Sequence, residues 1–287
     1  MADQAEKLRK MVEKKNSKEN KKKYRVIAFT SGKGGVGKTN IVANTAYLLS
    51  SIGKKVVVFD ADLGLANIDI LLGLKSKYSL IDVVKSGKKL KEIMVKVNDN
   101  FQVIPAGSGI EEIANINEPI FSKIKDELID ITKETDILLI DTGAGISRKV
   151  TFFLKSSEEI VVITTPEPTA LADAYAMLKI ISTNYKKEKV SVFVNMAKNQ
   201  QEAENTFTNL NKICKKFLNK EFKSSGYALI DKNLPIAVKQ QKPIAELYPN
   251  STFTISMKKF INNMFKENIK IRENPIARFF ASIFGGG

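Results

Sequence analysis

The sequence is short of residues that several function classes need. Its 287 residues include one cysteine, Cys214, which has no second thiol in the chain with which to form a disulfide or hold a metal cluster. No run of about 18 apolar residues occurs, so no segment is predicted to cross a bilayer. The first 23 residues are mostly polar or charged, so we expect no signal peptide. Together these absences favour a protein of the reducing cytosol.

Arginine is also scarce, although the chain is strongly basic. Only five of the 46 basic residues are arginine, and the formal net charge is +15. Such a charge is compatible with an anionic partner such as nucleic acid or a lipid surface. The lysines are spread over the whole chain, however, which favours a solvated lysine-rich surface. Charge alone therefore does not predict binding to nucleic acid.

Between residues 24 and 268, short apolar runs alternate with longer segments of helical periodicity. The runs are YRVIAFT, KKVVVFD, FQVIPA, TDILLID, EIVVITT, KVSVFVN and GYALI. This alternation predicts a single α/β domain with a doubly wound, mostly parallel sheet and helices on both faces. Residues 1–23 lie outside the domain and are expected to hold a short helix and a charged linker. Residues 269–287 are expected to hold a short amphipathic helix.

The stretch SGKGGVGKT, residues 31–39, follows the first apolar run and precedes a helical pattern. This is a P-loop in its strand, loop, helix setting. Its glycines let backbone amides turn towards a phosphate, and the amino terminus of the helix adds partial positive charge. Lys38 would neutralise phosphate oxygens, and the Thr39 hydroxyl suits Mg²⁺. Lys33 is one lysine more than such a loop needs. The predicted nucleotide contacts are Gly32, Lys33, Gly34, Gly35, Val36, Gly37, Lys38, Thr39 and Asn40.

Two acidic motifs end later apolar runs. FDADLGLANID contains Asp60 and Asp62, and DTGAGI contains Asp141. In a parallel sheet both motifs would lie at the carboxyl edge, beside the P-loop. Paired aspartates at a strand end can also cap a helix or face solvent, so one of the two need have no catalytic role. Asp141 can hold the water shell of Mg²⁺, and the Gly143 to Gly145 loop can sense a γ-phosphate through its amides. Two carboxylate sites at one P-loop favour nucleotide hydrolysis over passive binding.

The combination of KGGVGKT, DADLGLANID and DTGAGI resembles the deviant Walker A ATPases of the MinD/ParA group, over roughly residues 24–268. The resemblance implies an ATPase that uses ATP and Mg²⁺ and dimerises face to face, with Lys33 reaching the partner's ATP phosphates. It implies that Asp62 orients the attacking water, that Asp60 supports the Mg²⁺ or the switch region, and that Asp141 is the Walker B acid. The implied catalytic residues are Asp62, Lys33 and Lys38, and the implied metal site is Thr39, Asp62 and Asp141.

The resemblance also covers the base of the nucleotide. Asn195 ends the run KVSVFVN at the position where this group contacts adenine, although a polar residue that ends a strand is often only a turn former. The segment GYALIDKNLPIAVKQQKPI resembles the later nucleotide-flanking stretch of the group. It has Leu229 where relatives commonly place a proline, so contacts from this loop to the base stay open.

The segment NPIARFFASIFGGG, residues 274–287, places five bulky apolar side chains on one helical face. Pro275 suits the first turn of a helix and the glycines suit its end. With basic residues in and before it, this helix can bind a lipid surface, although a helix packed on its own domain shows the same pattern. One copy would bind lipid weakly, and two copies on a dimer would gain from avidity. The predicted membrane residues are Ile276, Phe279, Phe280, Ile283 and Phe284.

The other end begins MADQAEKLRKMV. Asp3 can cap a helix with Glu6 three positions on, and Ala5, Leu8 and Val12 share one helical face. Without further context, a terminal segment of this kind is usually frayed.

The element DQAEKLR resembles the DQAxxLR element of the FlhG family, also called YlxH or FleN. These MinD-like ATPases control flagellar number and position, and their element activates FlhF, a signal-recognition-type GTPase. The resemblance implies that Gln4 works at the active site of the GTPase and that Leu8 and Arg9 are docking contacts. MinD proteins begin almost at the first strand and lack this extension.

The resemblance therefore implies an ATPase that dimerises with ATP, binds the inner face of the cytoplasmic membrane and leaves it after hydrolysis. The implied partners are a second copy, an FlhF-type GTPase, flagellar switch-complex proteins and cytoplasmic membrane lipid, and not nucleic acid. Three alternatives remain: a division-site MinD, a ParA-type DNA-partitioning ATPase with its lysines on one dimer face, and a scaffold that binds ATP without turnover. A nitrogenase-reductase-like electron donor is excluded, because it needs two cluster cysteines per chain and only Cys214 is present.

Overall fold

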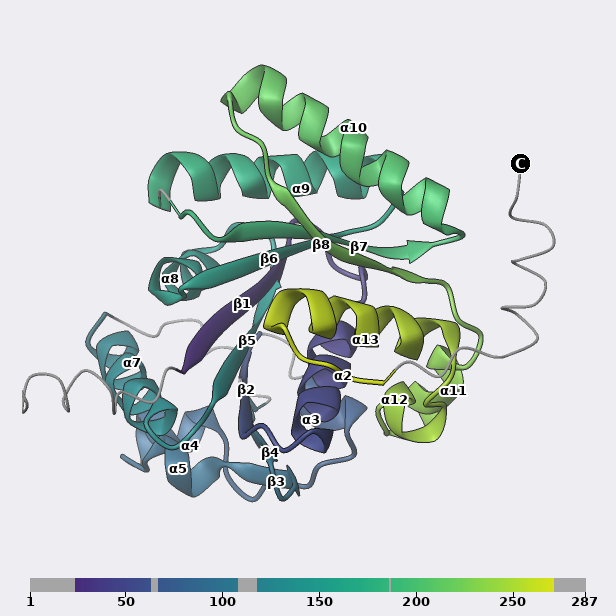
Figure 1. Cartoon of the computed structure of the whole chain (residues 1–287). Helices are drawn as coiled ribbons and strands as arrows, with labels where there is room; N and C mark the ends of the chain where they lie inside the picture. Colours follow the sequence, from purple (N-terminus) through teal and green to yellow (C-terminus); the bar gives the residue numbers. More distant parts are fainter. Residues whose placement is uncertain (1–23, 63–66, 108–117, 186, 271–287) are drawn as a thin grey trace, which may run out of the picture.

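The computed structural model describes residues 24–62, 67–107, 118–185 and 187–270. Within these ranges the strands form one eight-stranded sheet with the order β3-β4-β2-β5-β1-β6-β7-β8 (Figure 1). Every neighbouring pair is parallel except β3 and β4. The predicted α/β class is therefore confirmed. The strands are β1 (Arg25–Ser31), β2 (Val56–Ala61), β3 (Val95–Asn98), β4 (Phe101–Ile104), β5 (Ile137–Ala144), β6 (Glu159–Thr164), β7 (Val190–Ala197) and β8 (Lys223–Leu229).

Helices cover both faces of the sheet (Figure 1), as the sequence predicts. One face packs against α2 (Lys38–Ser51), α3 (Ile68–Leu71), α11 (Leu234–Lys239), α12 (Ile244–Leu247) and α13 (Thr252–Phe265). The opposite face packs against α4 (Leu80–Lys85), α5 (Leu90–Ile93), α7 (Glu118–Thr132), α8 (Arg148–Ser156), α9 (Pro168–Ile180), the short π-helix η1 (Ile181–Tyr185) and α10 (Gln200–Leu218).

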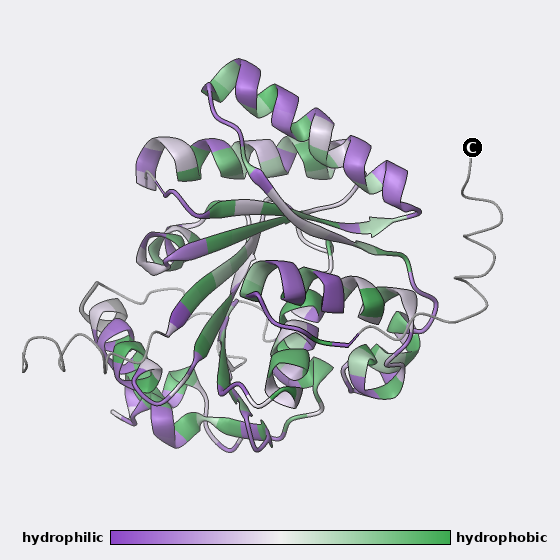
Figure 2. Cartoon of the chain, viewed as in Figure 1, coloured by the Kyte–Doolittle hydropathy of each residue, from purple (hydrophilic) through white to green (hydrophobic). Residues whose placement is uncertain are grey.

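The central strands are buried on both faces because the helices form two cores. Along β1, Ile27 and Phe29 belong to the core that contains α2, whereas Ala28 between them belongs to the opposite core. Successive side chains of a strand point to opposite faces, so two covered faces require a continuous apolar run. Figure 2 shows such apolar strands, with polar residues interspersed along the outer helices.

Strand β3 is not among the runs that the sequence predicts as strands. It pairs antiparallel with β4 at one edge of the sheet, and its four residues are half-buried or exposed. A strand that is not buried on both faces has no need of a continuous apolar run, so the sequence pattern does not reveal it.

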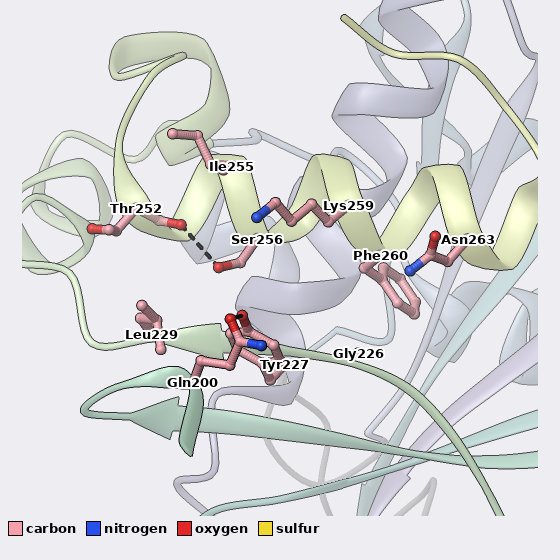
Figure 3. Close-up of a pocket in the computed structure, with 10 residues that line it drawn as sticks. All are labelled: Gln200, Gly226, Tyr227, Leu229, Thr252, Ile255, Ser256, Lys259, Phe260 and Asn263. Atoms are coloured by element: carbon pink, nitrogen blue, oxygen red, sulfur yellow. Dashed lines mark hydrogen bonds between the residues drawn. The ribbon is translucent and has the colours of Figure 1, made fainter. Parts of the chain in front are cut away.

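Strand β8 forms the other edge, with α13 packed beside it. A hollow of about 350 Å³ lies between them. Its lining includes the apolar side chains of Leu229, Ile255 and Phe260 and the polar side chains of Gln200 and Lys259 (Figure 3). Two hydrogen bonds span the lining residues: the Tyr227 hydroxyl donates to Gln200 Oε1 at 3.1 Å, and the Ser256 hydroxyl donates to the Thr252 carbonyl at 2.9 Å.

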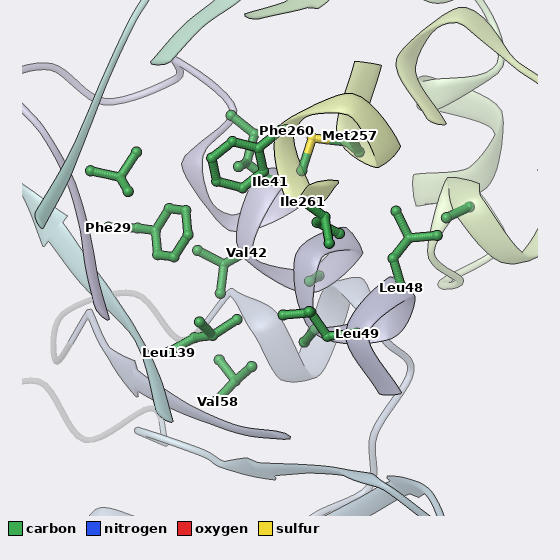
Figure 4. Packing of buried hydrophobic residues seen from close by; sticks show 14 of the residues in the cluster. Phe29, Ile41, Val42, Leu48, Leu49, Val58, Leu139, Met257, Phe260 and Ile261 are labelled. Atoms are coloured by element: carbon green, nitrogen blue, oxygen red, sulfur yellow. The ribbon is translucent and has the colours of Figure 1, made fainter. Parts of the chain in front are cut away.

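The helix that follows the P-loop is firmly anchored. Figure 4 shows α2 packed in one core, with Ile41, Val42 and Leu49 buried against the sheet and against side chains of α13. Phe260 of α13 meets Phe29 edge-on, with ring centroids 6.4 Å apart. Burial of each large apolar side chain contributes about 1.5–3 kcal/mol. This packing therefore fixes the position of the first turn of α2, which follows the P-loop.

Candidate nucleotide-binding site

Four loops meet at the carboxyl edge of the sheet because β2, β5, β1 and β6 are successive neighbours. The P-loop follows β1 and Asp62 follows β2, while Gly143 and Ala144 are the last residues of β5 and Gly145 begins the loop after it. Glu167 lies in the loop after β6. Parallel strands that end at one edge bring residues far apart in the sequence into one crevice, which is where ligands bind in open α/β sheets.

The P-loop leaves no room for a side chain at Gly32 and Gly37, whereas Gly34 and Gly35 have open space around them. A Cβ on Gly32 would lie 2.2 Å from the Asp173 carbonyl oxygen, and one on Gly37 would lie 2.4 Å from Asn195 Nδ2. A Cβ on Gly34 or Gly35 would meet nothing within 4 Å. The loop therefore packs against the protein at both ends and leaves its middle open to a ligand.

Lys38 is buried and forms an ion pair with Asp141. Their side chains are 8% and 1% exposed. The second oxygen of Asp141, Oδ2, is buried and has no hydrogen-bond partner among the described residues. Since buried carboxylate oxygens are nearly always satisfied, Asp141 fits a site for Mg²⁺ and its waters, whose preferred ligands are oxygens.

Asp60 lies beside Asp141, because the two residues are opposite each other in the register of β2 and β5. Its carboxylate accepts hydrogen bonds from the backbone N–H of Asp62 at 3.1 Å and of Asn67 at 3.3 Å. Burial raises the pKa of Asp60 to about 8, and the charge of Asp141 adds to the rise, while the two backbone N–H groups and Lys38 oppose it. Asp60 therefore ties the end of β2 to the start of α3. Its implied support of the Mg²⁺ or the switch region stays a prediction.

Asp62 is half-buried, whereas Asp60 is buried. A Cβ on Gly143 would lie 3.3 Å from Asp62 Oδ1, so the carboxylate is next to the loop that ends β5. That loop is fixed to the end of β1 by a hydrogen bond from the Gly145 N–H to the Ser31 carbonyl at 2.9 Å. The structure thus places Asp62 beside the loop predicted to sense a γ-phosphate. Its contacts to water and Mg²⁺ stay predictions.

The extra lysine has partners that are not among the predicted site residues. Lys33 Nζ donates to Glu167 Oε2 at 3.0 Å and to the Thr169 hydroxyl at 3.1 Å. The side chains of Lys33 and Glu167 are 42% and 66% exposed. The only sequence signal for this contact is that PEPTA follows the run EIVVITT at a strand end. That signal becomes useful only when β6 is known to lie next to β1.

Asn195 lies against the P-loop. It is buried at the end of β7, and its Nδ2 donates to the Val36 carbonyl at 2.8 Å. Asn195 therefore holds the P-loop in place, and its contact with adenine stays a prediction. Thr39 and Asn40 are half-buried in the first turn of α2. Their contacts with nucleotide and Mg²⁺ stay predictions.

Other predicted residues lie outside the described ranges, namely Gln4, Leu8 and Arg9 and the membrane residues Ile276, Phe279, Phe280, Ile283 and Phe284. In the described part of the chain, no helix has the length and apolar character needed to cross a membrane. Within the same ranges, no three His, Cys, Asp or Glu side chains gather as a metal cluster. Cys214 is buried, and burial raises the pKa of its thiol to about 11.

A glycine-rich loop between β1 and α2, with a buried lysine and two buried aspartates at its side, defines a P-loop nucleotide-binding protein. A family model described as ParA, a NUBPL iron-transfer P-loop NTPase, matches residues 22–265. The chain belongs to this ParA family of P-loop NTPases and, within it, to the FleN and YlxH group that the sequence resembles.

Two curated relatives support this assignment. The antiactivator FleN of Pseudomonas aeruginosa is 35% identical over 233 residues, which cover 81% of this chain and 83% of that protein. The flagellum site-determining protein YlxH of Helicobacter pylori is 36% identical over 264 residues, which cover 90% and 88%. A solved structure of the septum site-determining protein MinD from Pyrococcus horikoshii, complexed with Mg-ADP, has a TM-score of 0.72 over 86% of this chain and 100% of that one. At 21% identity it shows the fold alone.

Proposed function

We propose that the protein is an ATPase that binds ATP and Mg²⁺, dimerises with ATP, associates with the cytoplasmic membrane and regulates the number or position of flagella. The observation that carries the proposal is the pair of P-loop lysines: Lys38 is buried with Asp141, and Lys33 is exposed at the rim of the same crevice. The flagellar part rests on the names of the two relatives, an antiactivator and a flagellum site-determining protein.

The described residues fit MgATP. Lys38 would exchange Asp141 for phosphate oxygens, and the P-loop amides and the amino terminus of α2 would bind the remaining phosphate charge. Thr39 and Asp141 would hold the ion and its waters. Mg²⁺, when bound, neutralises charge that develops during phosphoryl transfer. Asp62, beside Gly143, would orient the attacking water.

Dimerisation would depend on Lys33. Its ion pair with Glu167 is exposed, and such pairs contribute only about 0.2–1 kcal/mol. Lys33 can therefore leave Glu167 at little cost when the phosphates of a partner's ATP offer a stronger contact. Binding across the dimer would place two carboxyl-terminal segments, residues 269–287, side by side on the inner face of the membrane.

The amino-terminal element would act on an FlhF-type GTPase, with Gln4 at the active site of the GTPase and Leu8 and Arg9 as docking contacts. Flagellar switch-complex proteins would be further partners. Removing residues 1–20 should abolish stimulation of GTP hydrolysis by the GTPase while ATP binding persists. Unchanged stimulation would favour the MinD-type alternative, which lacks this element.

Liposome sedimentation tests membrane association. The intact chain and a chain that ends at residue 273 would each be measured with ATP and with ADP. We expect strong binding only for the intact chain with ATP, since two weak anchors on a dimer gain about 10²- to 10⁴-fold in avidity. Equal binding in all four conditions would contradict the proposed switch.

Replacement of Asp62 tests hydrolysis. Asp62→Ala should fold normally, since the side chain is only half-buried, and it should still bind ATP through Lys38 and the P-loop amides. It should hydrolyse ATP at least about 100-fold more slowly, if Asp62 positions the water for attack. Unchanged hydrolysis would remove Asp62 from the mechanism. Absence of hydrolysis in the unmodified chain as well would indicate a scaffold that binds ATP without turnover.

A further inference from the structure

An apolar groove lies between α7 and α8, on the face of the sheet opposite to α2. The α7/α8 groove encloses about 210 Å³, and its lining includes Val26 of β1, Leu128 and Ile129 of α7, and Phe152 and Phe153 of α8. Ile129 is 43% exposed, although its neighbour Leu128 is buried. A hollow with these side chains is suited to hold further apolar groups, because their transfer from water is favourable.

The chain enters its described part at this groove. Tyr24, the first described residue, is itself a lining residue. The segment that precedes Tyr24 is therefore joined to the described part of the chain at the edge of the groove. The linker, residues 13–23, spans at most about 35–40 Å when fully extended, so residues 1–12 remain within reach of the groove and at a high local concentration.

The sequence of residues 1–12 supplies a matching surface. Ala5, Leu8 and Val12 are spaced by three and four residues, so a helix would present all three on one face. The lining of the groove also includes Lys125 and Glu158, and the segment carries both Glu6 and Arg9. We propose that residues 1–12 dock on the α7/α8 groove of the same chain, with Leu8 inserted between α7 and α8.

The hollow between β8 and α13 (Figure 3) is a weaker site for this segment. It lies at the edge of the sheet, three strands from β1, so the chain does not emerge beside it.

Docking would control the proposed activity of the segment. Where the proposed function holds, Leu8 is also a docking contact for the GTPase, and one side chain cannot occupy both sites. The free protein would therefore withhold residues 1–12 until a GTPase competes for them. Docking itself does not rest on the proposed function and can be measured without a GTPase.

The chain contains no tryptophan, so the fluorescence of a single introduced tryptophan reports on the environment of that position alone. In the full chain without nucleotide, Leu8→Trp should emit at shorter wavelength than Lys7→Trp and be quenched severalfold less by acrylamide, because position 7 lies off the apolar face. Adding Ile129→Asp to Leu8→Trp should raise its quenching to that of Lys7→Trp. The matched control is Ile213→Asp on α10, since Ile213 is 40% exposed, and it should change nothing.

Equal quenching of the two tryptophan variants would overturn the proposal, as would an Ile129→Asp variant without effect. If the Leu8→Trp side chain became easier to quench when the protein was diluted, the proposal would also be overturned, because docking within one chain is independent of protein concentration. Hydrogen exchange avoids the bulky probe: Leu8→Asp should speed exchange in α7 and α8, and Lys7→Asp should not. Equal exchange rates in both variants would contradict docking. A GTPase that fails to release the segment would count against the proposed function alone.

Discussion

The two halves of the P-loop differ in burial and in what they contact. Lys38 is buried with Asp141 in the middle of the sheet edge, whereas Lys33 is exposed and pairs with Glu167 in a neighbouring loop. A buried ion pair is hard to break, because the unpaired charge that would remain in the protein interior lowers the free energy of unfolding. An exposed ion pair can exchange its partner, because water and dissolved ions solvate a charge that has lost its partner. One lysine therefore belongs to the site of its own chain, and the other is available to a second chain.

Removal of Lys38 should have the largest effect. Lys38→Ala leaves the buried Asp141 unpaired beside Asp60, and the free energy of unfolding of the nucleotide-free protein should fall by about 3 kcal/mol. Nucleotide binding should be lost as well. Urea denaturation and titration with a fluorescent ATP analogue measure the two effects. Adding Asp141→Asn should recover most of the stability and none of the binding. If the urea concentration at the midpoint of unfolding were unchanged in Lys38→Ala, the ion pair of Lys38 with Asp141 would not stabilise the fold.

Removal of Lys33 should affect the dimer. Lys33→Ala should change the free energy of unfolding by less than about 0.5 kcal/mol and leave nucleotide binding by the monomer intact. Its ATP-induced dimer should be at least about 30-fold weaker, the equivalent of about 2 kcal/mol. Sedimentation velocity with ATP and with ADP measures this. Lys212→Ala, which removes an exposed lysine of α10, is the charge-matched control. A dimer of normal strength in Lys33→Ala would separate Lys33 from dimerisation.

The buried half of the loop could be predicted from the sequence and the contacts of the exposed half could not. Lys38 follows a strand and begins a helix within one continuous stretch, so local pattern alone fixes its setting. Asp141 ends an apolar run, and every such run in a parallel sheet ends at the same edge. Glu167 comes to Lys33 only because β6 lies beside β1, and the order of strands in a sheet is not encoded in the order along the chain.

The same limit applies to Asp60 and Asp62 at the end of β2. Spacing along the sequence places Asp60 and Asp62 together at a strand end, yet it does not reveal that Asp60 is fully buried opposite Asp141 while Asp62 lies against Gly143. The difference arises from the register of β2 with β5, which is set by pairing between strands about 80 residues apart and by helix packing on both faces.

Alanine at two glycines should distinguish the packed end of the loop from its open middle by the free energy of unfolding. Gly37 has a φ of 81° and no space for a Cβ beside Asn195, so Gly37→Ala should lower the free energy of unfolding by at least about 1–2 kcal/mol. Gly34 has open space around it, so Gly34→Ala should stay within about 0.5 kcal/mol of the unmodified protein. Thermal denaturation of the nucleotide-free proteins measures both. Equal losses would mean that the end and the middle of the loop are equally packed.

The smallest effect should come from the pair between Lys33 and Glu167 itself. A double-mutant cycle with Lys33→Ala and Glu167→Ala should give a coupling free energy of about 0.5 kcal/mol in the nucleotide-free protein. The coupling should disappear in about 1 M salt, where the Debye length is about 3 Å. The cycle of Lys38 with Asp141, measured in the same way, should keep its coupling in salt because solvent does not reach the pair. A Lys33 coupling that is large or insensitive to salt would mean that Glu167 holds the lysine in its own subunit, and ATP-induced dimerisation would then have to overcome that contact.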